Sequence, residues 1–106
     1  MNKRIRKKHR IGEFQELGFE LAFRIPESYD PATADAVIDD FLAQAIAGND
    51  LAFFGSGLHA VDGTVIAAAR GSVTPAQREA VDAWLTARDE VEAHTVGPLS
   101  DAWHAA

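Results

Sequence analysis

The sequence predicts an α+β fold, a ferredoxin-like βαββαβ sandwich in which two helices cover one face of a four-stranded antiparallel sheet. Three observations predict it: an apolar pattern of period two near the N-terminus, two strong helix-start signals, and an Asp-Gly dipeptide between two strand-like runs. With 106 residues the chain is long enough for one core. We expect residues 11–106 to form this single domain, preceded by a flexible basic arm at residues 1–10.

The first strand is expected at residues 19–25, where large apolar side chains alternate with small or charged ones before Pro26. One face of the strand then carries Phe19, Leu21, Phe23 and Ile25. A short helical turn is expected just before it, because Ile11, Phe14 and Leu17 recur every three residues ahead of Gly18. Gly18 would close this turn in the left-handed conformation, although a bulged strand would use the same residues.

The first helix is expected between Asp30, which suits an N-cap, and Gly48, which suits a helix end. Pro31 suits the first helical position. The apolar residues between these signals share one helical face: Ala34, Val37, Ile38, Phe41, Leu42, Ala45 and Ile46. Asp35, Asp39 and Asp40 fall on the outer side, where we interpret them as a solvated face and not as a catalytic or metal-binding group.

A hairpin is expected next, with a strand at residues 51–60 and its return at residues 64–69. Asp62-Gly63 is the preferred two-residue turn and would give Gly63 a positive φ. Gly55-Ser56-Gly57 interrupts the first of these strands. We interpret it as a bulge or a close backbone approach, because a phosphate cradle should lead into a helix.

The second helix begins at Thr74-Pro75-Ala76-Gln77, which combines an N-cap, a helix-opening proline and a capping-box residue. It should run to about residue 89 and bury one stripe, formed by Ala80, Val81, Trp84 and Leu85. A last strand is expected at residues 91–96. Residues 99–106 form a tail in which Leu99 and Trp103 are the expected contacts with the domain.

Charge is strongly segregated along the chain. The arm carries six of the ten Lys and Arg residues, namely Lys3, Arg4, Arg6, Lys7, Lys8 and Arg10. Residues 11–106 keep four cations against 16 carboxylates, a formal charge of −12. Such an acidic body repels nucleic acid, whereas the arm can bind phosphates. A merely solubilising tail is the alternative interpretation of the arm.

Several function classes are disfavoured. The chain has no cysteine, hence no disulfide and no thiolate chemistry, and no apolar run long enough for a signal peptide or a membrane span. Its four histidines show no metal-ligand spacing, and Ser56 lacks a nucleophile elbow. From the residues we expect a cytoplasmic, monomeric binding module without catalytic residues, metal, cofactor or small-molecule substrate.

Two motifs make the interpretation more specific. Residues 4–19 read Arg-Ile-Arg-Lys-Lys-His-Arg-Ile-Gly-Glu-Phe-Gln-Glu-Leu-Gly-Phe, which resembles the N-terminal signature of the YggL family of small bacterial proteins. Residues 51–57, Leu-Ala-Phe-Phe-Gly-Ser-Gly, are similar to a second hallmark of that family, Leu-Ala-Phe-x-Gly-Ser-Gly. The chain departs from the pattern where Trp103 is followed by His104 instead of a second Trp and an acid.

The resemblance implies a non-enzymatic protein that associates with the large (50S) ribosomal subunit. The arm would contact ribosomal RNA, and the acidic body would face a ribosomal protein. Further expected partner contacts are Phe14, Gln15, Phe53, Gly55, Ser56, Gly57 and Trp103.

Two alternatives stay open at this point. One is a protein–protein adaptor in which the basic tail is incidental. The other is a small enzyme whose pocket would combine residues 55–57 with His59 and Asp62, which requires a deep pocket with convergent polar groups.

Overall fold

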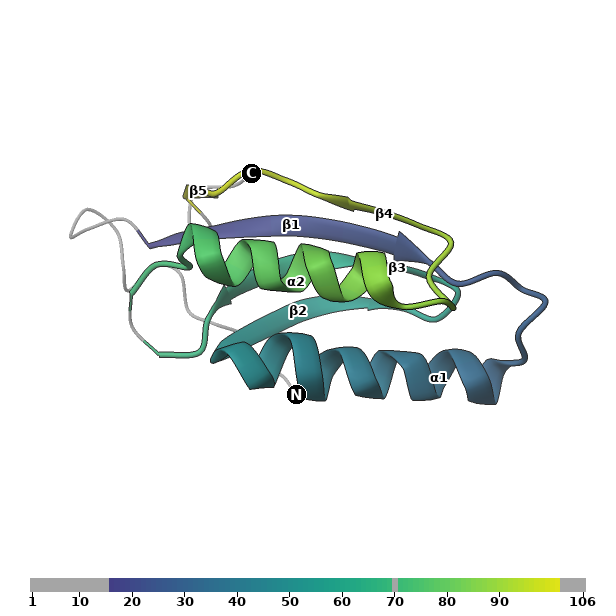
Figure 1. The fold of residues 1–106 in the computed structure, drawn as a ribbon. Helices are drawn as coiled ribbons and strands as arrows, with labels where there is room; N and C mark the ends of the chain where they lie inside the picture. Colours follow the sequence, from purple (N-terminus) through teal and green to yellow (C-terminus); the bar gives the residue numbers. More distant parts are fainter. Residues whose placement is uncertain (1–15, 70, 102–106) are drawn as a thin grey trace.

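The computed structural model describes residues 16–69 and 71–101, which fold into strands and two helices in the order expected from the sequence. Figure 1 shows these elements along the chain. In order they are β1 (Leu17–Arg24), α1 (Pro31–Asp40), the π-helical η2 (Phe41–Ile46), the 3₁₀ turn η3 (Ala47–Asn49), β2 (Leu51–Gly57), β3 (Ala60–Ala67), α2 (Pro75–Ala87), β4 (Ala93–Val96) and β5 (Ser100–Asp101).

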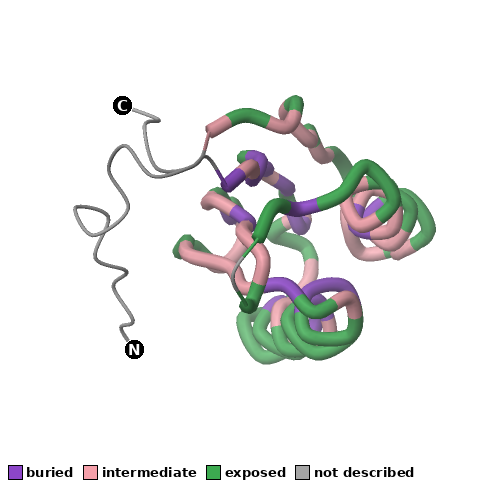
Figure 2. Tube along the Cα trace, turned by 90° about the vertical axis from the view of Figure 1, so that its left-hand side faces the viewer, coloured by how far each residue is buried: buried purple, intermediate pink, exposed green. Residues whose placement is uncertain are grey.

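The strands form one antiparallel sheet in the order β2-β3-β1-β4, which confirms the α+β class. β5 adds a fifth strand, because Ser100 pairs with Gly18 and Asp101 pairs with Leu17. The predicted count of four was therefore wrong. The short run after Pro98 carries no strand pattern of its own and is strand only through its partner. Seen along the sheet in Figure 2, both helices lie on the same side of it, an arrangement consistent with the predicted sandwich.

The side chains of β1 that the alternating pattern predicted to be buried do face the core. Phe19, Leu21 and Phe23 are buried, whereas Glu20 and Arg24 are exposed. The helical turn predicted to end at Gly18 is wrong for its described residues, because Leu17 and Gly18 belong to β1. Tertiary contacts hold the Leu17 backbone in this strand: its amide donates to Oγ of Ser72 at 2.8 Å, and its carbonyl oxygen accepts from the Val73 amide at 2.9 Å. Ile11 and Phe14 lie outside the described residues.

Asp30 caps α1 as predicted, since its Oδ1 accepts a hydrogen bond from the Thr33 amide at 2.8 Å. This hydrogen bond lowers the pKa of Asp30. After Asp40 the helix continues as the π-helical η2, whose residues bury Phe41 and Ile46. Leu42, expected on the buried face, is instead 38% exposed. The wider π-helical turn departs from the α-helical spacing on which that expectation rested.

The hairpin is where the sequence prediction fails. Asp62 and Gly63 lie inside β3, and the turn falls at Leu58 and His59, between Gly57 and Ala60. Gly57 takes the positive φ, at 124°, and Gly63 does not. The uninterrupted register of β2 on β3 also excludes the predicted bulge within residues 51–57. The longer β3 places Val61 and Val65 opposite Phe23 and Phe19, where both valines are buried.

Gly55 and Gly63 are instead a cross-strand pair with a close backbone approach, the second interpretation of the glycine run. A Cβ on Gly63 would lie 2.4 Å from the Phe54 carbonyl oxygen and 2.7 Å from Cζ of Phe53. The ring of Phe53 also lies against Gly55, 2.5 Å from where its Cβ would be. Both positions therefore require glycine for steric reasons and not for a turn.

We expect Gly63→Val to lower the free energy of unfolding by about 1–3 kcal/mol, the usual cost of overpacking. Chemical denaturation measured by circular dichroism would determine the loss. Thr64→Val is the matched control, since it places the same β-branched side chain at the next position of β3, which already carries one. Equal stability of the two variants would contradict the close approach.

The second helix follows its start signal closely. Oγ1 of Thr74 accepts from the Gln77 amide at 3.1 Å, and the Gln77 side chain accepts from the Thr74 amide at 2.9 Å, which completes the predicted capping box. Val81 and Leu85 are buried, and Trp84 packs against the core. β4 begins two residues later than expected, at Ala93.

Candidate functional site

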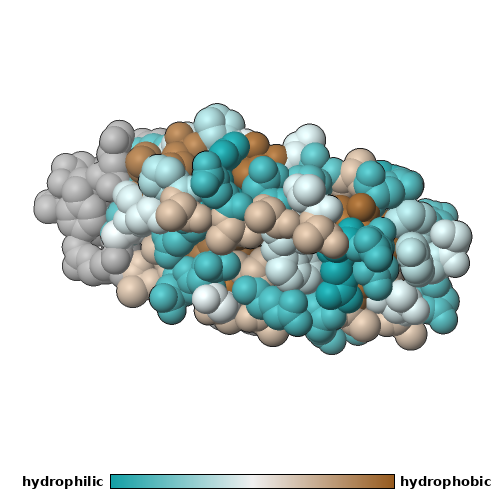
Figure 3. Space-filling model, in the orientation of Figure 1, coloured by the Kyte–Doolittle hydropathy of each residue, from teal (hydrophilic) through white to brown (hydrophobic). Residues whose placement is uncertain are grey.

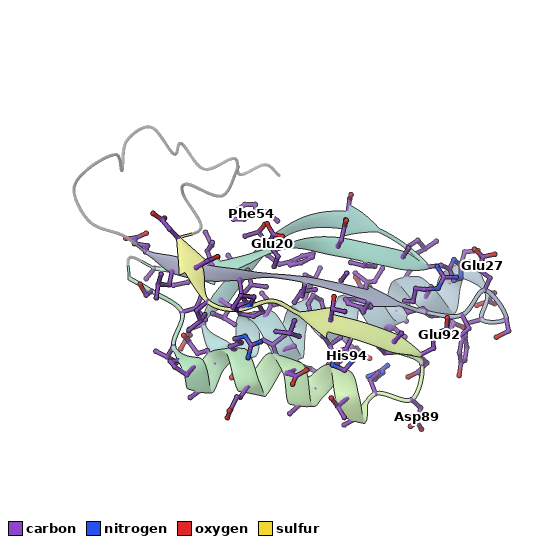
Figure 4. All side chains as sticks on the ribbon, turned by 90° about the horizontal axis from the view of Figure 1, so that it is seen from above. Glu20, Glu27, Phe54, Asp89, Glu92 and His94 are labelled. Atoms are coloured by element: carbon purple, nitrogen blue, oxygen red, sulfur yellow. The ribbon has the colours of Figure 1, made fainter. Side chains whose placement is uncertain are left out.

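The sheet has a distal face, defined here as the face that points away from α1 and α2. Two rows of side chains cross it. Phe54, Thr64 and Glu20 form one row, because Thr64 pairs with both of the others. Ser56, Asp62, Ala22 and Thr95 form the next row, again through successive strand pairs. In Figure 4 the labelled Phe54 and Glu20 project from this side of the sheet, opposite α2.

The two rows line a shallow hollow of about 630 Å³. Its floor is low where the small side chain of Ala22 stands between those of Asp62 and Thr95, and the backbone of Gly55 and Gly63 also lines it. Glu20 and Asp62 are the charged residues of the lining, and both are exposed. The hollow is thus acidic and hydroxyl-rich, with one aromatic ring, Phe54, at its side.

This arrangement does not assemble the enzymatic pocket considered above. Asp62, Gly55 and Ser56 line the hollow, but His59 does not. The His59 ring lies at the hairpin turn, where Nε2 is 3.0 Å from the carbonyl oxygen of Tyr29. Within residues 16–69 and 71–101, no three His, Asp or Glu side chains could hold a metal ion together.

The described part of the chain holds three arginines, and each is engaged within the protein. Arg24 pairs with Glu92 at 3.2 Å. Arg78 donates to the carbonyl oxygens of residues 96 and 97 at 2.9 and 2.6 Å. These two contacts leave no free guanidinium on β1 or at the start of α2.

Arg88 completes this set by joining the ends of the two helices. It forms ion pairs of 2.8 Å with Asp40 and with Glu90, and its guanidinium lies over the ring of Trp84 at 5.4 Å. Partial burial would lower the pKa of Arg88, but the hydrogen bonds to Asp40 and Glu90 outweigh it and raise the pKa above its usual value.

The helix side of the molecule is acidic as well. Asp35, Asp39 and Glu79 are exposed on α1 and α2, as the solvated-face interpretation predicted. Figure 3, which faces the helices, shows hydrophilic residues spread over both of them. The described residues therefore present carboxylates on both sides of the sheet and no cluster of free cations.

The expected site residues are distributed as follows. The six arm cations, Phe14, Gln15 and Trp103 lie outside the described residues. Gly55, Ser56 and Gly57 are exposed, and the first two line the hollow. The side chain of Phe53 instead packs edge-on against Phe41, with 5.4 Å between ring centroids, on the helix side of the sheet. Its neighbour Phe54 occupies the distal face in its place.

Glu20 and Thr95 also line the hollow, although no sequence motif marked them as site residues. The alternating pattern of β1 was sufficient to place Glu20, because the residues between the buried positions of a strand share the opposite face. Thr95 joins them only through the pairing of β4 with β1, which no local pattern specifies. In the described part of the chain, no helix combines the length and apolarity needed to cross a bilayer.

The fold and its surfaces define a class: small α+β proteins with a shallow distal face and strong charge segregation, suited to binding a macromolecule more than to enclosing a small substrate. A comparison with protein families makes this specific. The model of the YggL 50S ribosome-binding protein family matches residues 3–104, and the chain belongs to that family.

A relative in Haemophilus influenzae, described as an uncharacterized protein, is 36% identical over 102 residues. The match covers 96% of this chain and 89% of that relative. No solved structure matches the chain.

Proposed function

We propose that this protein is a non-enzymatic component that binds the large (50S) ribosomal subunit in the cytoplasm. The family match supports the partner. The assignment of the RNA contacts to the arm rests on one observation: all three described arginines are engaged in contacts within the protein. A phosphate ligand would have to break those contacts or use the remaining cations, six of which belong to the arm.

The arm, residues 1–10, would act as a separate segment whose Lys and Arg side chains contact ribosomal RNA phosphates. Phosphate contacts of this kind provide affinity and orientation without reading a sequence. The remaining residues would form a single domain of the ferredoxin-like type, an inference that the strand order β2-β3-β1-β4 and the two helices on one side support.

The acidic body would complement a basic ribosomal protein and discourage indiscriminate RNA binding. Like charges repel phosphates, and complementary potentials favour the correct partner. Exposed Asp35, Asp39 and Glu79 on the helices supply such a surface.

Cosedimentation with purified ribosomal subunits tests the proposal. We expect the protein to pellet with 50S subunits at low and moderate salt and to remain largely in the supernatant with 30S subunits. A protein that stays in the supernatant with 50S subunits at both salt concentrations would refute it. Equal pelleting with both subunits would indicate unspecific attraction of the arm to RNA.

A further inference from the structure

We propose that the distal face of the sheet is the docking site of the chain's own basic arm while the protein is free of the ribosome. This inference goes beyond ribosome binding, because it concerns the isolated protein. The arm would lie across the two rows of distal side chains and would have to leave them before its cations could contact phosphates.

Charge complementarity is the first argument. Glu20 and Asp62 are both exposed in the lining of the hollow, and none of the arginines that the structure describes lines it. Arg24 follows Ala22 on the same face, but it is already paired with Glu92 at 3.2 Å. Among the described residues, the two carboxylates of the hollow thus have no neighbouring free cation, whereas the arm has six cations among its ten residues.

The chemistry of the lining suits Lys and Arg side chains in particular. Phe54 stands in the same row as Glu20, separated from it by Thr64. An aromatic ring attracts ammonium and guanidinium groups through its face, and a guanidinium can contact a ring and a carboxylate at once. The hydroxyls of Ser56, Thr64 and Thr95 add acceptors for the remaining N–H groups.

Chain length is the second argument. The described chain begins just before β1, and Glu20 lies three residues into that strand, roughly 10 Å from Leu17 at 3.3 Å per residue. The six residues 11–16 span up to about 20 Å when extended. Arg10 and the residues before it can therefore fold back over the hollow without any change in the domain.

Tethering favours this occupant over a basic segment of another molecule. A segment joined by a short linker has an effective concentration in the millimolar range. Docking through exposed carboxylates is nevertheless weak and is screened by salt. A dense array of phosphates would displace the arm, whereas a short or isolated RNA strand would have to compete with the distal face. The contact would therefore act as a filter against unspecific RNA.

Paramagnetic relaxation in the free, full-length protein tests the docking. The chain has no cysteine, so Asn2→Cys provides a single attachment point for a nitroxide label. At low salt we expect the label to broaden the amide signals of Thr64 and Thr95 more than that of Asp82 on α2, and the difference to vanish near 1 M salt. The effect should not depend on protein concentration.

A charge-matched pair of variants gives the control. We expect E20Q/D62N to reduce the broadening at Thr64 at least twofold, and D35N/D39N, which removes the same charge from the outer side of α1, to leave it nearly unchanged. Circular dichroism would verify that both variants are folded. In a filter-binding assay with a short oligo(U), E20Q/D62N should bind several-fold more tightly than D35N/D39N.

Three results would overturn the inference: no preferential broadening on the distal face at low salt, equal effects of the two double variants, or broadening that scales with protein concentration and so reports the arm of a second copy. All of these measurements are made without ribosomes. Their failure would leave 50S binding intact, and a failure of cosedimentation would leave the docking result intact.

Discussion

Replacing all six arm cations by alanine is expected to abolish most binding to the 50S subunit while the domain stays folded. The three described arginines are held by carboxylates and carbonyl groups of the protein, so they do not substitute for the arm. The arm residues precede β1, and the first buried side chains in the described part of the chain are those of Glu16 and Phe19, so the loss of arm charge should not unfold the domain.

The salt dependence gives this prediction a number. With up to six phosphate contacts at about 0.7–0.9 counterions each, log affinity should fall with log salt with a slope of roughly −4 to −5. Between 50 and 200 mM salt the affinity would fall by roughly two to three orders of magnitude. Each single alanine substitution in the arm should flatten the slope by about one contact's share.

Two matched measurements make the result interpretable. Changing the six cations to the other basic residue, Lys for Arg and Arg for Lys, keeps the charge and should keep most of the affinity and slope. Circular dichroism and thermal melting of the six-alanine variant should match the unmodified protein. A folded variant that still binds with full affinity and salt dependence would show that the acidic body carries recognition, as in a protein adaptor.

Phe41→Ala is expected to lower the free energy of unfolding by about 3–5 kcal/mol, the largest effect on stability that we expect from one substitution. Phe41 is fully buried, and its ring contacts those of Phe23, Phe53 and Trp84 at centroid distances of 5.0, 5.4 and 5.8 Å. Its removal therefore leaves a cavity that three elements would have to close. A small domain has only about 5–15 kcal/mol in total.

Leu42→Ala is the control for this substitution, since the neighbouring side chain is 38% exposed. Its cost should stay near or below about 1 kcal/mol because much of the removed surface already faces water. Denaturant unfolding of both variants gives the two values, and Phe41→Ala should lower the melting temperature by roughly 12 °C or more. A loss below about 1 kcal/mol for Phe41→Ala would contradict its central place in the core.

Features that depend on neighbours within one turn or one strand could be predicted from the sequence. The alternation along β1 identified its buried face correctly, and Asp30 and Thr74 marked the helix starts through caps that the structure contains. The concentration of cations in residues 1–10 is likewise a property of the sequence alone. These features follow from side-chain period and local hydrogen bonds, which act over three or four residues.

Features that depend on partners far away in the chain could not be predicted in this way, because they follow from strand pairing and packing. Asp62-Gly63 favours a turn locally, but the structure places this dipeptide inside β3. There Val61 and Val65 pair with β1, and the Phe53 ring packs against Gly55 and Gly63. The turn preference of two residues is outweighed, because burying two valines and packing an aromatic ring together contribute several kcal/mol by area. The same reason explains the fifth strand, which exists only through its pairing with Leu17 and Gly18, and the distal hollow, whose rows combine residues from four strands.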